Sequence, residues 1–357
     1  PVFFYAFHVY TEAASALALF GGLALVGTGG WAAAGAAGLA LGLLPWLHVK
    51  MIAAAGAGGA TALARLRGRA LLAFAVTSAL TAAAYLAYLH HVFGRPTPLA
   101  IYHGAPAQMS GSPWSALAGL FLDRSFGLLW HAPVFLLGLA GLVPLARRWR
   151  DTGPLMFAAA AAIAPVLPWR MWWGGQSPPG RFLVPLVPLL AVAAALRVAH
   201  SPRGLARWRW PLAAIGLGLA LFAAARPGEL LLLNRGDRPT RLWAALSGHG
   251  SIEPYLPSIV NGGAAEWQVA AVWLAVLSGL LALDRLALRH DVADRAFRSL
   301  GLPLAVLLAL SIAVDRLIRA PEQGRPYAAS VAAGGASRRH QDATTPAARI
   351  PSTTVSR

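Results

Sequence analysis

Long apolar runs, separated by short connections, dominate the chain. A membrane-spanning helix needs about 20 mostly apolar residues, with a range of about 17 to 25. The pattern therefore predicts an all-α, polytopic transmembrane helical bundle of about ten spans. The apolar segments are residues 10–27, 31–47, 49–64, 70–92, 127–146, 154–169, 181–199, 210–226, 267–285 and 299–318. The second and third are short and meet near Pro45, so they form either two tilted spans or one broken hairpin.

Arginines gather in alternate connections of this predicted bundle. The four clusters are Arg65, Arg67 and Arg69; Arg147, Arg148 and Arg150; Arg197, Arg203, Arg207 and Arg209; and Arg285, Arg289, Arg295 and Arg298. Short loops rich in Lys and Arg stay on the cytoplasmic side of a membrane. The alternation therefore places these clusters in the cytoplasm and puts the loops 93–126, 169–181 and 227–266 on the external face.

These loops and the tail complete the predicted organisation. Trp114–Phe121 in the first long loop is a short amphipathic piece suited to the membrane interface, and 227–266 is expected to form a small external cap. We expect one transmembrane helical domain over residues 1–319. From residue 320 to 357 the chain is rich in Ala, Ser, Thr, Arg and Pro without periodicity, which predicts a disordered tail.

Composition agrees with a membrane protein and excludes several chemistries. The chain is 57% hydrophobic and 12% charged, whereas about 25% of the residues in a soluble domain are charged. The net charge of +17 comes from arginine, since Lys50 is the one lysine, and we assign it to cytoplasmic loops rather than to nucleic-acid binding. The absence of cysteine excludes disulfides, thiolate metal sites and cysteine nucleophiles.

The connection 169–181 combines residue types that suit an interface with a phosphate-bearing lipid. Its tryptophans, which prefer the level of the lipid headgroups, are Trp169, Trp172 and Trp173. Arg170 and Arg181 flank a Gly-Gly and a Pro-Pro-Gly turn, and two guanidinium groups across such a turn can converge on one anion. The alternative is that both arginines anchor the loop at the interface.

Two further groups of polar residues lie at the same predicted end of the bundle. Tyr5, His8 and Glu12 share one helical face, so they form either a polar seam between helices or part of a site. His48 and Lys50 follow Pro45 at the outer end of the short hairpin. Lys50 is either a side chain that snorkels to the interface or a ligand for phosphate oxygens.

Candidates for acid–base and metal chemistry are few. Glu12 and Asp123 are the acids near the outer ends of predicted spans, and both are candidate catalytic carboxylates. Asp123 also suits a helix cap, since it precedes an apolar segment. Histidines 90, 91 and 103 lack a carboxylate partner at a diagnostic spacing, so we predict no metal site and no certain cofactor.

Four stretches together resemble a known family. They are PVFFYAFHVYTE (1–12), GLALGLLPWLHVK (38–50), LDRSFGLLWHAPVFLLGLAGL (122–142) and WWGGQSPPGRFLVPLVPLL (172–190). They resemble segments of bacterial integral-membrane glycosyltransferases of the GT-C superfamily, which includes protein mannosyltransferase and aminoarabinose transferase relatives. The resemblance covers roughly residues 1–200, and the Trp-Gly-Gly…Gly-Arg-Phe-Leu…Pro…Pro run is its most specific part.

The resemblance implies an enzyme of the bacterial cytoplasmic (inner) membrane. Its expected activity is transfer of a sugar from a polyprenyl-phosphate donor to a hydroxyl of an envelope glycan, lipid or protein on the external face. Lys50, Arg170 and Arg181, with His48, Tyr5 and His8, would hold the donor phosphate. The family's base lies in a first external loop, which is expected upstream of Pro1; Glu12 and Asp123 are weaker candidates. The alternatives are a transporter or flippase of a lipid-linked anion and a non-catalytic membrane subunit.

Overall fold

The computed structural model describes residues 10–98, 108–230, 234, 240–247, 252–291 and 294, and within them the regular structure is helical. The α-helices are α2 (Thr11–Thr28), α3 (Trp31–Gly42), α4 (Leu44–Leu47), α5 (Ile52–Arg65), α6 (Gly68–Phe93), α8 (Pro113–Leu122), α9 (Leu128–His131), α10 (Phe135–Arg147), α11 (Trp149–Ile163), α12 (Val187–His200), α13 (Arg209–Ala224), α14 (Pro227–Leu230), α15 (Arg241–Ser247) and α16 (Ala264–Ala287). Short 3-10 helices are η1 (Val49–Met51), η3 (Ala164–Val166), η4 (Arg181–Leu186), η5 (Gly204–Trp208) and η6 (Glu253–Tyr255). The described residues form no strand beyond one isolated bridge, which confirms the all-α prediction.

Four helical segments in the described part of the chain are long and apolar enough to cross a membrane. They are α2, α6, the continuous segment Arg181–His200 formed by η4 and α12, and α16. Other predicted segments form shorter apolar helices, and 299–318 lies outside the described residues. The structure therefore supports a membrane protein with four membrane-length helices, and the count of ten spans remains a prediction.

Prolines explain why two predicted segments are interrupted. The segment 127–146 is divided into α9 and α10, with the break at Ala132-Pro133. A residue before proline is pushed out of the α region, and Ala132 has φ −149° and ψ 70°. At Leu43, where α3 gives way to α4, Pro45 stands in the first turn of the new helix, a position that does not require its missing N–H.

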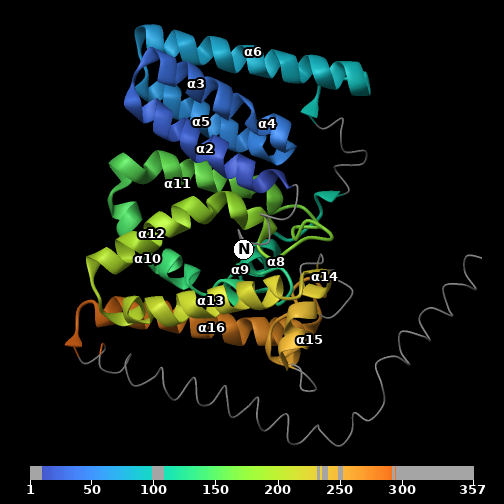
Figure 1. Cartoon of the computed structure of the whole chain (residues 1–357), viewed down its shortest axis with the longest axis vertical. Helices are drawn as coiled ribbons and strands as arrows, with labels where there is room; N and C mark the ends of the chain where they lie inside the picture. The colour runs from blue at the N-terminus through green and yellow to red at the C-terminus, as the bar shows by residue number, and fades with distance from the viewer. Residues whose placement is uncertain are drawn as a thin grey trace, which may run out of the picture.

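The helices pack pairwise into a layered bundle (Figure 1), and small residues set the closest approaches. In the upper part of Figure 1, α2 packs on α3 and α3 on α6, while α11 contacts α5 and joins this part to the helices below, where α10 packs on α12. A Cβ atom on Gly38 would overlap Thr77 of α6, and one on Gly141 would overlap the backbone of Ala193 in α12. These glycines therefore allow the helix backbones to come close together.

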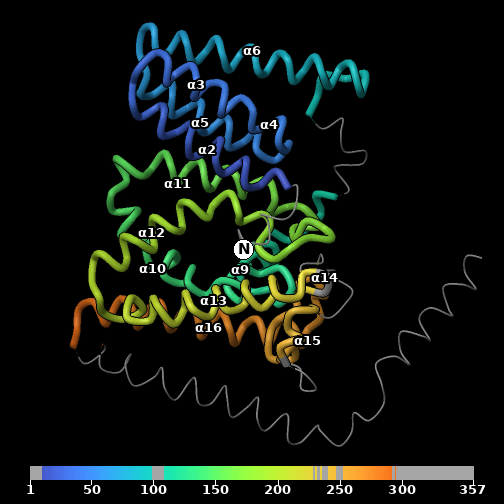
Figure 2. The backbone as a smooth tube through the Cα atoms, in the orientation of Figure 1, coloured from blue at the N-terminus to red at the C-terminus, as the bar shows by residue number. Residues whose placement is uncertain are grey.

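The backbone trace (Figure 2) separates the two kinds of connection. The α5–α6, α10–α11 and α12–α13 connections, which carry arginine clusters, and the end of α16 all lie at the left of the view. Arg65 Nη2 donates to the carbonyl of Arg150 at 3.4 Å, which joins two of the clusters directly. The α4–α5 connection and α8 lie further to the right of the view. The alternation predicted from the arginines is thus matched by the arrangement of the helix ends.

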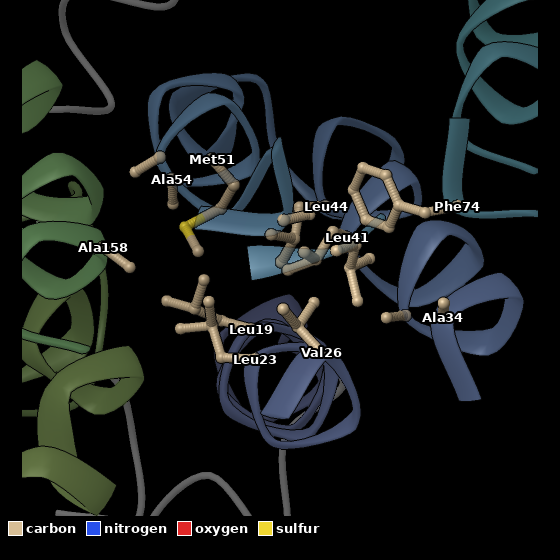
Figure 3. Close-up of a cluster of buried hydrophobic side chains, with 14 of the residues drawn as sticks. Leu19, Leu23, Val26, Ala34, Leu41, Leu44, Met51, Ala54, Phe74 and Ala158 are labelled. Atoms are coloured by element: carbon tan, nitrogen blue, oxygen red, sulfur yellow. The ribbon is translucent and has the colours of Figure 1, made fainter. Parts of the chain in front are cut away.

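A hydrophobic cluster anchors the element that carries Lys50. Leu19, Leu23 and Val26 of α2 pack with Met51 and with residues of α3, α5, α6 and α11. Figure 3 shows Met51 directed into this cluster toward α2. Because Met51 is buried, the chain is fixed one residue after Lys50, and the lysine is held beside the start of α2.

Candidate functional site

Glu12, Lys50 and Arg181 form one ion cluster, although 169 positions separate the first from the last. Arg181 Nε donates to Glu12 Oε1 at 2.8 Å, and Lys50 Nζ donates to the same oxygen at 3.4 Å. Glu12 is 1% exposed and Lys50 is 8% exposed. A buried charge is costly unless it is paired. The single carboxylate partly offsets that cost for two cations.

Three different elements place these side chains. Glu12 stands in the first turn of α2, on the face that also buries Ser15 and Leu19. Lys50 lies in η1, between α4 and α5, and Arg181 is the first residue of η4. Because η4 and α4, the helix that precedes η1, both pack against α2, the helix that carries Glu12 lies close to the segments that bring the cations.

Glycines shape the loop that leads to Arg181. Gly174 has φ +85° and Gly180 has φ +69°, a left-handed region that other residues rarely adopt. Arg181 Nη1 donates to the carbonyl of Gly174 at 2.9 Å, and a Cβ on Gly174 would lie 3.0 Å from the arginine Cδ. The turn predicted from the glycines and prolines is therefore folded back on the arginine and fixes its orientation.

Aromatic rings complete the cationic side of the site. Lys50 Nζ lies 3.6 Å from the centroid of the Phe182 ring, and Arg181 Cζ lies 4.4 Å from that of Tyr10. A cation over a ring face is stabilised by the ring quadrupole. Tyr10 and Phe182 were not singled out in the sequence, although Phe182 follows Arg181 directly and could have been.

His48 lies beside Lys50 as a neutral hydrogen-bonding group. Its Nδ1 accepts from the backbone N–H of Lys50 at 3.2 Å, so in the neutral ring Nε2 carries the proton. Burial, aided by the nearby Lys50 charge, lowers the pKa of His48 to about 4. The histidine therefore adds a potential N–H donor to the site and no charge at neutral pH.

A cavity of about 250 Å³ opens beside these residues. Its wall is formed by His48, Val49, Lys50, Met109, Pro165, Val166, Trp169, Met171, Gly174, Arg181 and Phe182. Lys50 and Arg181 are the charged residues of this wall, and most of the remainder is apolar. An amphiphile with an anionic group fits this distribution, since the cations suit the anion and the apolar surface suits a hydrocarbon chain.

The charge of the cluster favours an anion. With both cations protonated and Glu12 ionised, the three side chains carry a net charge of +1. Lys50 lies in a connection outside the four membrane-length helices, and burial lowers its pKa to about 7 against the opposing effect of Glu12. An anion in the cavity would favour the charged lysine. Anion binding and protonation of Lys50 are therefore coupled.

The structure separates Arg170 from this site. Its side chain is exposed and does not line the cavity, while its backbone N–H donates to the carbonyl of Gln108 at 2.7 Å. The expected convergence of Arg170 and Arg181 on one anion is therefore not found. Arg181 turns inward because Glu12 and the Gly174 carbonyl accept its N–H groups.

The three tryptophans of the loop have different environments. Trp169 lines the cavity, and Trp173 is half-buried and packs on Phe126 with ring centroids 6.3 Å apart. Trp172 is 4% exposed and its ring lies against Gly119 of α8, where a Cβ would overlap it. Trp172 is therefore part of the core, which corrects the lipid-interface role expected for it.

Asp123 caps backbone N–H groups and does not line the cavity. Its Oδ1 accepts from the N–H groups of Ser125 and Phe126 at 2.9 and 3.0 Å, and its Oδ2 accepts from that of Val260 at 3.1 Å. Burial raises the pKa of Asp123 to about 6, although these hydrogen bonds oppose the shift. The geometry matches the capping interpretation, since the carboxylate ties the turn after α8 to the chain before α16.

Other contacts join the same turn to the expected external cap. Trp243 Nε1 donates to the carbonyl of Arg124 at 2.8 Å, and the Thr240 backbone N–H donates to Glu253 Oε1 at 2.6 Å. The Ser125 and Thr240 hydroxyls lie 2.6 Å apart. The described part of 227–266 thus packs on the turn that Asp123 organises. Trp114–Phe121 lies within helix α8, and its place at the membrane interface stays a prediction.

Two of the predicted site residues lie in the part of the chain that the structure does not describe. Tyr5 and His8 lie outside the described residues, so the expected seam with Glu12 is represented here by Glu12 alone. Within the described ranges, no group of three or more His, Cys, Asp or Glu side chains could hold a metal ion. The candidate site is therefore built from Glu12, Lys50, Arg181 and His48.

The fold and this site define a helical protein with membrane-length apolar helices and a cationic cavity at one end of the bundle. Comparison with protein-family models, curated proteins and solved structures finds no match to the chain. Any assignment of activity therefore rests on the residues of the cavity and on the sequence resemblance described above.

Proposed function

We propose that this protein is a bacterial, multi-pass membrane glycosyltransferase. In this proposal it moves a sugar from a polyprenyl-phosphate donor to an acceptor hydroxyl at the external face of the cytoplasmic membrane. The observation that carries the proposal is the placement of Lys50 and Arg181, paired to the buried Glu12, in the wall of an otherwise largely apolar cavity. The family resemblance of the same stretches supports it.

The cavity supplies what sugar transfer from a lipid phosphate requires on the donor side. Negative charge grows on the phosphate as the bond to the sugar breaks, and fixed cations stabilise that charge. Lys50 and Arg181 are held in place by Glu12 and by the Gly174 carbonyl before the donor arrives. The apolar wall that includes Met171 and Phe182 suits the start of an isoprenoid chain.

The proposal assigns positioning rather than catalysis to the two candidate carboxylates. Glu12 Oε1 is engaged by both cations, and Asp123 accepts three backbone N–H groups away from the cavity. Neither carboxylate lines the cavity, so neither is placed to take a proton from an acceptor hydroxyl there. The general base is therefore a further residue, and Glu12 serves to orient Lys50 and Arg181.

The test is sugar transfer by the full chain in lipid nanodiscs. Radiolabelled polyprenyl-phosphate hexose is the donor, and a bacterial envelope fraction supplies acceptors. We expect the wild type to transfer label and the double variant Lys50→Ala, Arg181→Ala to lose about 100-fold or more in rate, since each cation contributes to stabilising the departing phosphate. Arg95→Ala, which removes an exposed arginine after α6, should leave the rate within about twofold.

Two results would contradict the proposal in different ways. Equal transfer by the wild type and the double variant would remove Lys50 and Arg181 from the donor site. Donor binding without transfer, accompanied by movement of the donor between leaflets, would contradict the enzyme and favour a flippase for a lipid-linked anion.

A further inference from the structure

Glu12 pairs with both cations of the cavity but is not itself part of the cavity wall. The cavity wall presents Lys50 and Arg181, whereas Glu12 is buried and does not line the cavity. Its Oε1 accepts from both cations, which favour the ionised carboxylate, while its Oε2 has no hydrogen-bond partner among the described residues. A ligand in the cavity therefore meets the cations directly and Glu12 at slightly longer range.

We infer that Glu12 is a charge-selectivity residue, which offsets the attraction of Lys50 and Arg181 for a dianionic phosphomonoester and so shifts the preference of the cavity toward the monoanionic phosphodiester of the same lipid. This inference rests on the proposed function, because it concerns the same donor site. It goes further by naming the ionic class of ligand that the site retains and the residue that determines it.

Short distances make this repulsion effective. Glu12 Oε1 lies 2.8 Å from Arg181 Nε and 3.4 Å from Lys50 Nζ. A phosphate oxygen bound to either nitrogen at about 2.8 Å therefore comes within roughly 6 Å of the carboxylate. At that separation in a partly buried site, Glu12 opposes each negative charge on the ligand by an amount worth about tenfold or more in affinity. It therefore offsets part of the attraction of Lys50 and Arg181, and it opposes a dianion twice as strongly as a monoanion.

No other charge in the cavity wall compensates for Glu12. His48 is neutral at pH 7 because burial lowers its pKa to about 4, and the remaining wall residues are uncharged. A monoanion matches the net charge of +1 that Glu12, Lys50 and Arg181 carry together once the bound anion has favoured protonation of Lys50. A dianion would leave one negative charge unmatched in a largely apolar cavity.

In the proposed reaction this preference would distinguish the lipid donor from the lipid product. The acceptor oxygen forms a bond to the anomeric carbon, the bond from that carbon to the phosphate oxygen breaks, and its electron pair remains on the phosphate. The acceptor proton leaves to the general base. The diester donor thereby becomes a lipid monoester, whose second pKa is about 6 and which is mostly a dianion at pH 7.5. Glu12 would then favour donor binding and product release.

Two probes that differ in charge and share one tail test the inference. They are farnesyl phosphate and its methyl diester, with neutral dimethyl farnesyl phosphate as the control for binding through the tail. Dissociation constants are measured at pH 7.5 with the full chain in nanodiscs. We expect the wild type to bind both charged probes more tightly than the neutral control. We also expect its ratio of monoester affinity to diester affinity to be about tenfold or more below that of Glu12→Gln.

Variants at position 12 separate selectivity from structure. Glu12→Gln should raise affinity for the monoester about tenfold more than affinity for the diester, because the repulsion it removes acts more strongly on the dianion. Glu12→Asp should retain the preference, since it keeps the charge. A thermal unfolding curve for each variant reports folding, and a merely structural role for Glu12 would weaken both probes alike.

The outcomes distinguish this inference from the proposed function. An unchanged preference in a folded Glu12→Gln protein overturns the selectivity role even if sugar transfer is observed. The predicted change in preference, with no transfer to any acceptor, supports the selectivity role and contradicts the glycosyltransferase. Equal binding of all three probes by the wild type overturns both the selectivity role and the phosphate site.

Discussion

Two buried ion clusters lie at opposite ends of the same helical segment, and they are built differently. At one end of Arg181–His200, Arg197 pairs with Asp284 of α16 through Nε at 2.9 Å and Nη2 at 2.5 Å. Arg197 also donates to the carbonyls of Ser201 and Arg203, and Asp284 Oδ1 accepts from the Leu205 N–H. This pair is neutral overall, and its hydrogen bonds engage both side chains extensively.

The cluster at the other end is unbalanced. Two cations, Lys50 and Arg181, share one oxygen of Glu12, and both cations line a cavity. A neutral, bidentate ion pair suits a structural role in holding two helices together. A cluster with surplus charge beside a cavity suits a ligand, because the ligand completes it. The comparison thus separates a structural ion pair from a candidate site by charge balance and by access to a cavity.

The largest expected effect is on stability at the Arg197 end. Asp284→Asn keeps the shape of the side chain but leaves Arg197, which is 1% exposed, as an uncompensated buried cation. We expect a loss of about 3–5 kcal/mol in the free energy of unfolding, measured by denaturant unfolding in detergent. Glu12→Gln should cost clearly less, since in the absence of a ligand Lys50 can become neutral at modest cost when its pKa is near 7, whereas an anion in the cavity favours its charged form.

Asp291→Asn is the matched control, because Asp291 pairs with Arg203 at 2.9 Å on an exposed surface. Exposed ion pairs contribute about 0–1 kcal/mol, so little change in stability is expected. If Glu12→Gln destabilised the protein as much as Asp284→Asn, both clusters would be structural. Charge balance and access to a cavity would then not separate a structural ion pair from a ligand site.

A second expected effect is a pH dependence confined to the Lys50 end. The pKa of Lys50 is lowered from 10.5 to about 7, so its charge is present below pH 7 and is lost as the pH rises above it. Affinity for methyl farnesyl phosphate, which stays monoanionic, should therefore fall by up to about tenfold per pH unit between pH 7.5 and 9. Binding at pH 6 to 9 measures this.

Lys50→Arg provides the control for this pH dependence. Guanidinium remains charged throughout the range, so the variant should bind the diester with a nearly flat profile. An equally steep fall in Lys50→Arg would show that another group titrates, and Lys50 would lose its assigned role.

Part of this arrangement could be predicted from the sequence. Apolar runs and alternating arginines indicated the helices and which helix ends lie together. The same alternation placed Glu12, Lys50 and Arg181 at one end, where the structure does bring them together. The helix breaks were less accessible, because Pro133 divides a segment that hydrophobicity alone marks as continuous.

What could not be predicted depended on packing between distant segments. Trp172 is buried because Gly119, more than 50 positions earlier, leaves room for its ring. Arg197 was interpreted only as a marker of topology, and its partner Asp284 follows a long apolar run in α16. An acid in the last turn of an apolar helix, next to Arg285 in an arginine-rich end, was the available signal for that pair.

The smallest expected effect concerns Arg170, which the sequence could not distinguish from Arg181. Both arginines flank the same glycine-rich loop, but Arg181 reaches Glu12 at 2.8 Å, whereas Arg170 is exposed and away from the cavity wall. Arg170→Ala should therefore change affinity for methyl farnesyl phosphate by less than about twofold, while Arg181→Ala should weaken it by about tenfold or more. Binding measured in parallel on both variants tests this. A similar loss in both would mean that the general positive charge of the loop attracts the anion, and that pairing to the buried carboxylate does not define the site.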